Sequence, residues 1–178
     1  MELTKISRAF VLHWGEMGTS WGVNRTISQI HALLFFHGHP LHAEEIAETL
    51  DVARSNVSNS LKELQNWNLI RVTHVLGDRR DYFETSLDVW ELFRTVVRER
   101  KEREFDPTVR MLRDLIQKPE FKKERPDAQD RVRETLRLME SLGTWASEML
   151  RLTPSTLDKV LRLGAKVQQM VRGDGKSN

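Results

Sequence analysis

Two short amphipathic helices are predicted within residues 41–67. The first, over 43–50, carries a narrow apolar stripe beside three glutamates. The second begins at about Arg54 and ends at about Trp67, and its apolar side chains recur at the i, i+4 and i+7 positions, namely Val57, Leu61 and Leu64. Between the helices, Asp51 is one of the few non-glycine residue types that accept left-handed backbone angles at low cost. The pattern predicts a helix-turn-helix.

A β-hairpin is predicted directly after the second helix. Residues 69–75 are mostly β-branched and partly alternating, Gly77 and Asp78 supply a turn, and Tyr82 with Phe83 supports a return strand. This hairpin would form a two-stranded wing beside the helix-turn-helix, and Leu41 would form a minimal first strand before it.

Two further helices precede this region. One is predicted over 2–17, with a single apolar side made of Leu3, Ile6, Phe10, Trp14 and Met17. The other opens at Thr26, which stands three residues before Gln29 as in a capping box, and it ends at Gly38.

Helix resumes after the hairpin at about Leu87. The charged run 98–104 alternates in sign so that i,i+4 ion pairs form on a solvated helix, and Pro107 is expected to kink or restart the helix with Asp106 as its cap. Residues 118–127 are expected to form a loop.

Two more helices, 128–150 and one starting at Pro154, are predicted to finish the chain. Their apolar positions are spaced like a coiled-coil seam, in the first helix at Val132, Leu136, Met139, Gly143, Ala146 and Leu150, and in the second at Leu157, Val160, Leu161, Gly164, Val167 and Val171.

The predicted fold class is therefore mainly α: a winged helix-turn-helix with a two-stranded β-wing and additional N- and C-terminal helices that form a dimerisation arm. The regions expected are residues 1–23 as an N-terminal helix of the arm, 24–86 as the winged domain, 87–172 as a helical dimerisation and effector region, and 173–178 as a disordered tail. A winged helix that works as a monomer needs no such arm, so homodimerisation is the favoured use; packing of the same helices onto their own winged domain is the alternative.

The exposed face of the helix 54–67 is typical of a surface that contacts DNA. Arginine pairs with guanine, asparagine with adenine, and hydroxyl groups with either base, whereas an ordinary solvated helix would carry more glutamate and lysine. The residues expected to enter the major groove are Arg54, Ser55, Asn56, Ser58, Asn59 and Lys62.

Two arginines, Arg79 and Arg80, occupy the predicted hairpin tip between Asp78 and Asp81. They are expected to hold the wing on the phosphate backbone or in the minor groove, with Asp78 fixing the rotamer of one arginine through a charge-assisted hydrogen bond. A surface turn with incidental charges is the alternative.

The run DVARSNVSNSLKELQNWNLIRV, the wing GDRRDYFE and the amino-terminal stretch WGVNRTISQIHALLFFHGHPL together resemble MarR-type winged-helix regulators. Within that family the chain is most similar to the GbsR branch of repressors that respond to glycine betaine and choline. The resemblance covers about half of the chain and implies operator binding, repression and a quaternary ammonium effector. His42 and Ala53 depart from it, because a capping serine or threonine is usual at both positions.

Composition narrows the class further. Lys and Arg exceed Asp and Glu by only 2, yet residues 54–80 contain five basic and two acidic side chains, a local excess of three where DNA contact is expected. The chain has no cysteine, which excludes disulfides and cysteine nucleophiles, and it shows neither a long apolar run nor a signal-peptide pattern. We expect a cytoplasmic protein without membrane contact.

Other chemistry has little support in the sequence. His37, His39 and His42 form an H-x-H-x-x-H cluster, but no carboxylate within it completes a metal site, so no metal or other cofactor is expected. No phosphate-binding loop, nucleophile elbow or zincin motif is present, so an enzyme is not expected.

The chain contains five tryptophans, which could supply an aromatic cage for a quaternary ammonium effector. Trp14 and Trp21 are the candidates, because they lie near flexible glycines where the first helix meets the winged domain. A core or dimer role is the more usual one for tryptophan on an apolar helix stripe.

The sequence as a whole predicts a dimeric, sequence-specific transcriptional regulator, acting as a repressor that a small molecule releases from a pseudo-palindromic double-stranded operator. Two alternatives remain: a winged helix that contacts a protein, and an architectural protein that binds DNA without sequence preference.

Overall fold

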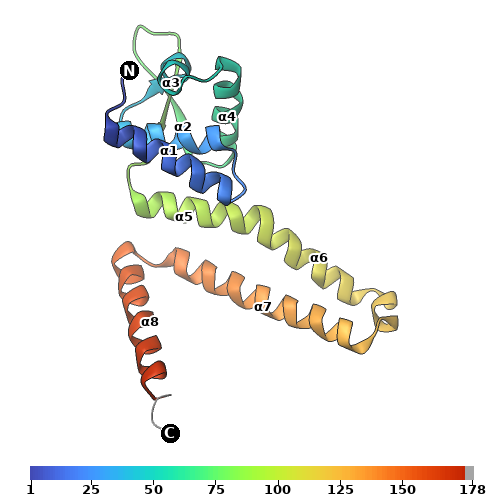
Figure 1. The fold of residues 1–178 in the computed structure, drawn as a ribbon. Helices are drawn as coiled ribbons and strands as arrows, with labels where there is room; N and C mark the ends of the chain where they lie inside the picture. The colour runs from blue at the N-terminus through green and yellow to red at the C-terminus, as the bar shows by residue number, and fades with distance from the viewer. Residues whose placement is uncertain (175–178) are drawn as a thin grey trace. The chain divides into compact units, whose positions relative to one another are not determined.

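The computed structural model describes residues 1–174, with side chains described through residue 164. Their contacts divide the chain into two compact units, Met1–Glu99 and Arg100–Asn178 (Figure 1). The predicted fold class is confirmed, since the chain is mainly helical and carries a small antiparallel sheet in a winged-helix arrangement. The predicted tail 173–178 lies outside the described residues from position 175 onward.

The first unit contains five helices and three strands within its described residues. In chain order they are α1 (Lys5–Ser20), α2 (Arg25–His37), β1 (Leu41–His42), α3 (Ala43–Leu50), α4 (Arg54–Asn66), β2 (Ile70–His74), β3 (Asp81–Thr85) and α5 (Val89–Arg100). The strand order is β1-β3-β2, with Leu41 opposite Phe83 and Val72 on the other side of Phe83. The predicted minimal first strand therefore adds a third strand to the two-stranded wing.

Helix α2 lies at the centre of this unit. Ile30, Leu33 and Leu34 of α2 are almost fully buried, and so are Ile46 of α3 and the predicted apolar positions of α4, Val57, Leu61 and Leu64. Burying each such side chain contributes roughly 1.5 to 3 kcal/mol, so these contacts fix α3 and α4 on α2.

Helix α1 approaches α2 through small residues. A Cβ added at Gly18 would lie 1.9 Å from Oγ of Ser28, and one at Gly15 would lie 2.6 Å from Cγ of Gln29. The apolar stripe predicted for this helix is only partly covered, since Ile6 is 73% exposed. The predicted start at residue 2 was wrong, because the side chain of Thr4 accepts a hydrogen bond from the N–H of Ser7 and begins the helix at Lys5.

The predicted capping box at Thr26 was also wrong. The Oδ1 atom of Asn24 accepts the N–H of Thr26 at 2.8 Å, so Asn24 caps α2 and Gln29 is free to pack against Gly15. The predicted end is confirmed, with Gly38 in the left-handed region at φ 74°.

The second unit is built from helices. After a π-helical turn, η1 (Lys101–Phe105), come α6 (Asp106–Gln117), a 3₁₀ turn η2 (Pro119–Lys123), α7 (Pro126–Arg151) and α8 (Pro154–Asp174). The loop predicted over 118–127 thus contains η2 and the first residues of α7. The predicted i,i+4 ion pair between Arg100 and Glu104 is present at 3.2 Å.

A helix restarts at Pro107 as predicted, with this proline in the first turn of α6, and a π turn precedes the restart. The N–H of Asp106 donates to the carbonyl of Lys101, five residues earlier, and the carboxylate of Asp106 accepts a hydrogen bond from Nζ of Lys101 at 2.8 Å. Asp106 has helical backbone angles and makes no side-chain cap, so its predicted capping role was wrong.

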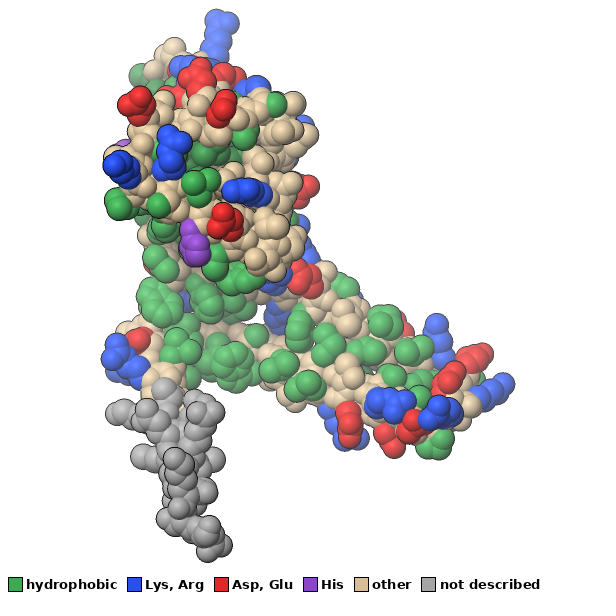
Figure 2. All heavy atoms as spheres, viewed as in Figure 1, with side chains coloured by type: hydrophobic (Ala, Val, Ile, Leu, Met, Phe, Trp, Pro, Cys, Tyr) green, Lys and Arg blue, Asp and Glu red, His purple; other side chains and the backbone are tan. Residues whose placement is uncertain are grey.

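The seam predicted for α7 is half-buried inside this unit, where α7 packs against α6 and η1. Gly143 lies opposite Phe105, whose Cδ1 atom would be 4.0 Å from a Cβ added at that glycine. Another set of apolar side chains on α7 stays exposed, namely Leu138, Leu142 and Trp145. Figure 2 shows hydrophobic side chains over α6 and α7. Of the seam predicted for α8, Leu157 is buried, and Val167 and Val171 lie outside the residues whose side chains are described.

A half-buried histidine, His31, links α2 to the sheet. Nε2 of His31 lies 3.2 Å from Oγ1 of Thr85, and the Thr85 hydroxyl donates to the carbonyl of Leu69 at 2.8 Å. The hydroxyl proton is therefore committed to Leu69, and Nε2–H of His31 is the donor to Thr85. Burial lowers the pKa of His31 to about 4.

We expect the unfolding free energy to fall as the pH drops from about 6.5 to about 4. In this window the unfolded chain binds a proton on His31 that the folded chain does not, and the full effect is at most about 3 kcal/mol. In urea titrations at several pH values, His31→Gln should show a flatter dependence on pH than the parent chain. His13→Gln, on the exposed side of α1, should retain the parental dependence. Parallel profiles for all three proteins would contradict this account.

Candidate nucleic-acid interface

Helix α4 is held by its underside and by the turn before it. Val57 is fully buried and Leu61 and Leu64 are nearly so. Asp51 adopts the predicted left-handed conformation, with φ 53° and ψ 50°, and it ends α3. Ala53 precedes α4 and makes no side-chain cap, so tertiary packing rather than capping sets the position of this helix.

The upper face of α4 carries the predicted polar set. The exposed members that make no hydrogen bond or ion pair within the described part of the chain are Ser55, Asn56, Asn59 and Lys62. Their donors and acceptors therefore face solvent and are open to a ligand.

The other two predicted residues of α4 are bonded to each other. A guanidinium nitrogen of Arg54 donates to the hydroxyl of Ser58, which in turn donates to the carbonyl of Arg54 at 3.1 Å. Nε of Arg54 also donates to Glu44 of α3 at 2.8 Å, and this hydrogen bond holds the pKa of the Glu44 carboxyl below its usual range. The carboxylate fixes the orientation of an otherwise mobile arginine.

A hollow of about 300 Å³ separates the first turns of α4 from the wing. Its walls come from α3, α4 and the strands β2 and β3, and its charged members are Glu44, Arg54, Lys62, Arg80 and Asp81. Three of the six predicted helix residues, Arg54, Ser58 and Lys62, thus border the same groove as Arg80 of the wing. Figure 1 shows α3, α4 and the wing loop of the first unit.

The two wing arginines have different surroundings. Arg80 forms an ion pair with Asp78, and the phenol of Tyr82 also donates to Asp78 at 2.9 Å. These bonds lower the pKa of Asp78, chiefly through Arg80, and raise the pKa of Arg80. The predicted role of Asp78 in fixing an arginine is confirmed. Arg79 is exposed and makes no hydrogen bond or ion pair among the described residues.

His42 joins this region, which the sequence did not predict. The residue ends β1 directly before α3, and its N–H donates to the carboxylate of Glu45 at 3.0 Å. Its ring lies edge-on to Tyr82, with centroids 5.4 Å apart, and contacts Arg80 and Glu44. The spacing of His42 and Glu45 matches a capping box with histidine in place of serine, and that is the signal that could have located it.

The three histidines of the H-x-H-x-x-H motif, His37, His39 and His42, do not gather at one point. His42 is buried, whereas His39 is exposed and stacks edge-on with His37 at 5.7 Å. Among the described residues, no three histidine or acidic side chains gather in a way that would hold a metal ion. No described helix is long and apolar enough to cross a membrane.

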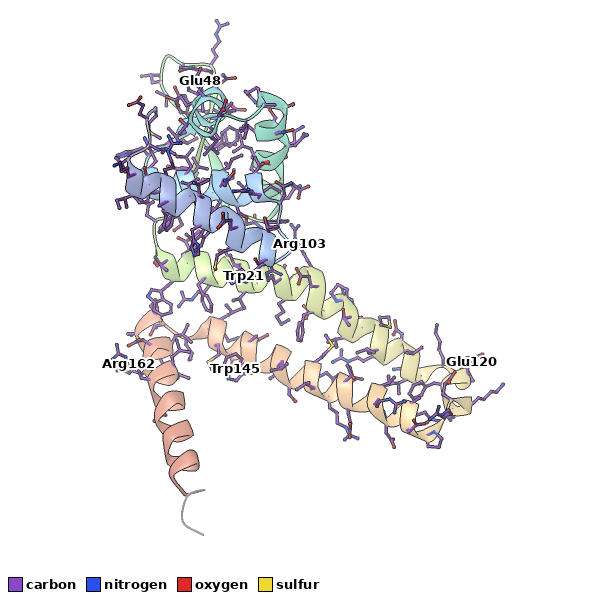
Figure 3. The ribbon with its side chains drawn as sticks, viewed as in Figure 1. Trp21, Glu48, Arg103, Glu120, Trp145 and Arg162 are labelled. Atoms are coloured by element: carbon purple, nitrogen blue, oxygen red, sulfur yellow. The ribbon has the colours of Figure 1, made fainter. Side chains whose placement is uncertain are left out.

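The two tryptophans proposed for an effector are exposed, Trp14 by 41% and Trp21 by 61%. Trp14 stacks on Phe10 at 5.5 Å, and Trp21 follows the last residue of α1 (Figure 3). Neither lines the groove beside α4 or a second hollow of about 400 Å³ between α2, the sheet and α5. None of the residues lining that second hollow is Trp, Tyr or Phe, the residues whose ring faces hold quaternary ammonium groups.

Comparison with known proteins agrees with the winged fold. Residues 21–81 match the model of the MarR family. No curated protein matches the chain. A solved structure described as a transcriptional regulator is 23% identical, covers 82% of this chain and 95% of its own, and gives a TM-score of 0.61.

Two other solved structures are more distant. The chain is 18% identical to a MepR mutant of S. aureus bound to an oligodeoxyribonucleotide, covering 76% of this chain and 91% of that one at a TM-score of 0.39. It is 17% identical to NadR in complex with 4-hydroxyphenylacetate, covering 84% and 89% at a TM-score of 0.37. The match to the MarR family model is confined to residues 21–81, and the structure with a TM-score of 0.61 shares the winged-helix fold.

Proposed function

We propose that this chain is a dimeric transcriptional repressor that recognises a pseudo-palindromic DNA operator through α4 and its wing. The observation that carries the proposal is the upper face of α4, where Asn56, Asn59 and Lys62 are exposed and unbonded beside the groove that Arg54 and Arg80 also border. A helix fits the major groove, and amide side chains pair with adenine there.

The contacts divide into two kinds. Ser55, Asn56 and Asn59 would meet base edges, with Arg54, Ser58 and Lys62 at the flanks of the same helix face. Arg79 would meet phosphates or the minor groove, because it extends from the wing without a partner, and Arg80 would support the wing at its base.

A homodimer follows from the geometry of an inverted repeat. Two copies related by twofold symmetry present their recognition helices about 34 Å apart, which is one turn of DNA. We propose that the exposed apolar face of α7, made of Leu138, Leu142 and Trp145, takes part in this contact, because large exposed hydrophobic side chains on one helix face are typical of an interface.

A small-molecule effector would act by binding the DNA-competent and incompetent states with different affinities. The resemblance to the GbsR branch favours choline or glycine betaine, and exposed Trp14 and Trp21 supply aromatic faces for such a cation. Thermal denaturation over a roughly 10³-fold range of concentrations of either compound tests this. A ligand at about 100 times its Kd raises the unfolding free energy of the protein by roughly 2.7 kcal/mol. Stabilisation that disappears in Trp14→Ala but not in Trp90→Ala would support the site; no shift with either compound would remove the effector proposal.

Selection of bound sequences from random DNA tests the function as a whole. An inverted repeat with half-sites one turn apart is the expected result. Binding to all duplexes with the same affinity and a steep salt dependence would instead indicate an architectural protein, and no DNA binding would favour a winged helix that contacts a protein.

On the selected operator, Asn59→Ala should lower the preference for operator over random DNA by roughly 1 to 3 kcal/mol, because a base contact is lost. Arg79→Ala should weaken both duplexes alike and reduce the salt dependence. Asn66→Ala is the matched control, since the same amide stands seven residues, or about 10 Å, further along α4. Equal losses on operator and random DNA for Asn59→Ala would contradict base recognition.

Leu142→Glu should convert the dimer to monomers in sedimentation velocity and weaken operator binding by about tenfold or more, because both half-sites are no longer engaged together. The far-UV circular dichroism should not change, since Leu142 is exposed. Thr144→Glu adds the same charge about 200° further around α7 and should leave the dimer intact. A Leu142→Glu variant that remains dimeric would exclude this face.

A further inference from the structure

His42 is a buried imidazole placed between the two DNA-facing parts of the winged unit. Its side chain is 9% exposed, and both ring nitrogens have polar partners. Nε2 lies 2.7 Å from Nη1 of Arg80 on the wing side, and Nδ1 lies 3.0 Å from Oε2 of Glu44 on α3. The start of α3 has two contacts of its own: the carboxylate of Glu45 accepts the N–H of His42, and the N–H of Glu45 lies 3.4 Å from Nδ1 of His42.

The partners of His42 determine where its proton lies. A guanidinium group has donors and no acceptor, so Nε2 of His42 must accept from Arg80 and cannot carry a proton. The ring proton is then on Nδ1 and is donated to Glu44. In this arrangement the imidazole is neutral, and the Nδ1–H bond to Glu44 at 3.0 Å takes the place of the longer contact, 3.4 Å, in which the N–H of Glu45 donates to Nδ1.

The same carboxylate continues the chain of bonds to the recognition helix. Oε1 of Glu44 accepts from Nε of Arg54 at 2.8 Å, and Arg54 in turn holds Ser58. Every donor in the series has an acceptor: Arg80 donates to His42, His42 to Glu44, and Arg54 to the other oxygen of Glu44. We propose that His42 is a positioning residue that couples Arg80 of the wing to Arg54 of α4, and that protonation of His42 breaks this coupling.

Protonation changes the donor pattern at one atom. A protonated ring carries a hydrogen on Nε2, which then faces the donor of Arg80 instead of accepting from it. The nearest other acceptor is Oε2 of Glu45, 3.4 Å from Nε2, and Glu44 remains bonded to Nδ1. The proton added at Nε2 is therefore donated to Glu45 of α3.

The other charged groups near His42 allow this change. On the wing, Arg80 keeps its ion pair with Asp78, and Tyr82 keeps its hydrogen bond to the same carboxylate, so the wing stays folded when it loses His42. On α3 and α4, Glu44 and Glu45 attract the protonated ring while Arg54 retains Glu44. What is lost is the hydrogen bond between Arg80 and His42, while the pairing of β1 with β3 and the contact between His31 and Thr85 still hold the wing on the winged unit.

The expected change of DNA affinity with pH, which rests on the proposed function, is opposite in sign to the usual one. Adding positive charge near DNA normally strengthens binding. Here protonation of His42 removes the link between Arg80 of the wing and Arg54 of α4, so the affinity should fall as the pH is lowered, by about fivefold if one hydrogen bond's contribution to alignment is lost.

The first test needs no DNA. In ¹⁵N-resolved NMR spectra of the full-length protein at pH 8, His42 should be the Nδ1–H tautomer, and the Nη–H signals of Arg80, whose Nη1 atom contacts His42, should shift when the pH is lowered. In His42→Asn, which keeps a good helix cap but does not reach Arg80, the Arg80 signal should no longer follow pH; His39→Asn, an exposed neighbour, should match the parent. An Nε2–H tautomer, or an Arg80 signal indifferent to the titration, would overturn the coupling whether or not the protein binds DNA.

The second test measures the coupling on selected operator DNA at fixed salt. On acidification from pH 8 the parent should lose about fivefold in affinity and His42→Asn should not, while His31, present in both proteins, contributes equally. A double-mutant cycle of Arg54→Ala and Arg80→Ala should show non-additivity at pH 8 that disappears on acidification and in His42→Asn. Additive effects at pH 8, or the same pH profile in both proteins, would refute the proposal while leaving operator binding itself established.

Discussion

The burial of three side chains under α4 is the constraint on which the proposed DNA-binding surface depends. No side chain caps the start of this helix, and serine and asparagine are weak helix formers in its interior. Val57, Leu61 and Leu64 therefore supply the stability that the upper face does not. Because the helix is held from below, its upper side chains need no partners within the protein and stay available to a ligand.

The two arginines nearest the groove follow the opposite rule. Arg54 and Arg80 are each held by a carboxylate, so they are oriented before any ligand arrives, whereas Arg79 and Lys62 keep their rotamer freedom. An oriented arginine loses less entropy on binding but must share its charge with its partner. The interface thus combines two fixed guanidinium groups with mobile charges at its edges.

Local patterns predicted the winged unit well and its connections less well. The period of Val57, Leu61 and Leu64 and the turn tolerance of Asp51 identified the helix-turn-helix, because both are properties of short segments. The sequence could not show that Gly15 and Gly18 allow α1 to pack closely against α2, since a close approach depends on the side chains of the facing helix. The π turn before Pro107 was missed for a related reason: proline indicates a lost donor but not how the chain compensates.

The residues of the candidate site also differ in how well the sequence predicts them. The exposed residues of α4 could be predicted from helical spacing, whereas the role of His42 depends on Arg80, which is 38 residues away in the chain and comes close only through the pairing of β1 with β3. His42 was grouped with His37 and His39 because they are near in sequence, yet the strand directs it into the winged unit. Long-range partners of this kind cannot be derived from spacing alone.

The charge distribution bears on why the proposed regulator would act as a dimer. The chain has a net charge of only +2, and two of the basic groups at the groove already have acidic partners. Few phosphates are therefore neutralised by one copy, and non-specific attraction per half-site is weak. Linking two such surfaces makes the second binding event intramolecular and raises the affinity without adding charge. Weak electrostatic attraction, with uncharged amide and hydroxyl groups at the centre of the α4 face, would then favour discrimination between sequences over tight binding to any duplex. Such a balance would suit the proposed release of the operator by an effector.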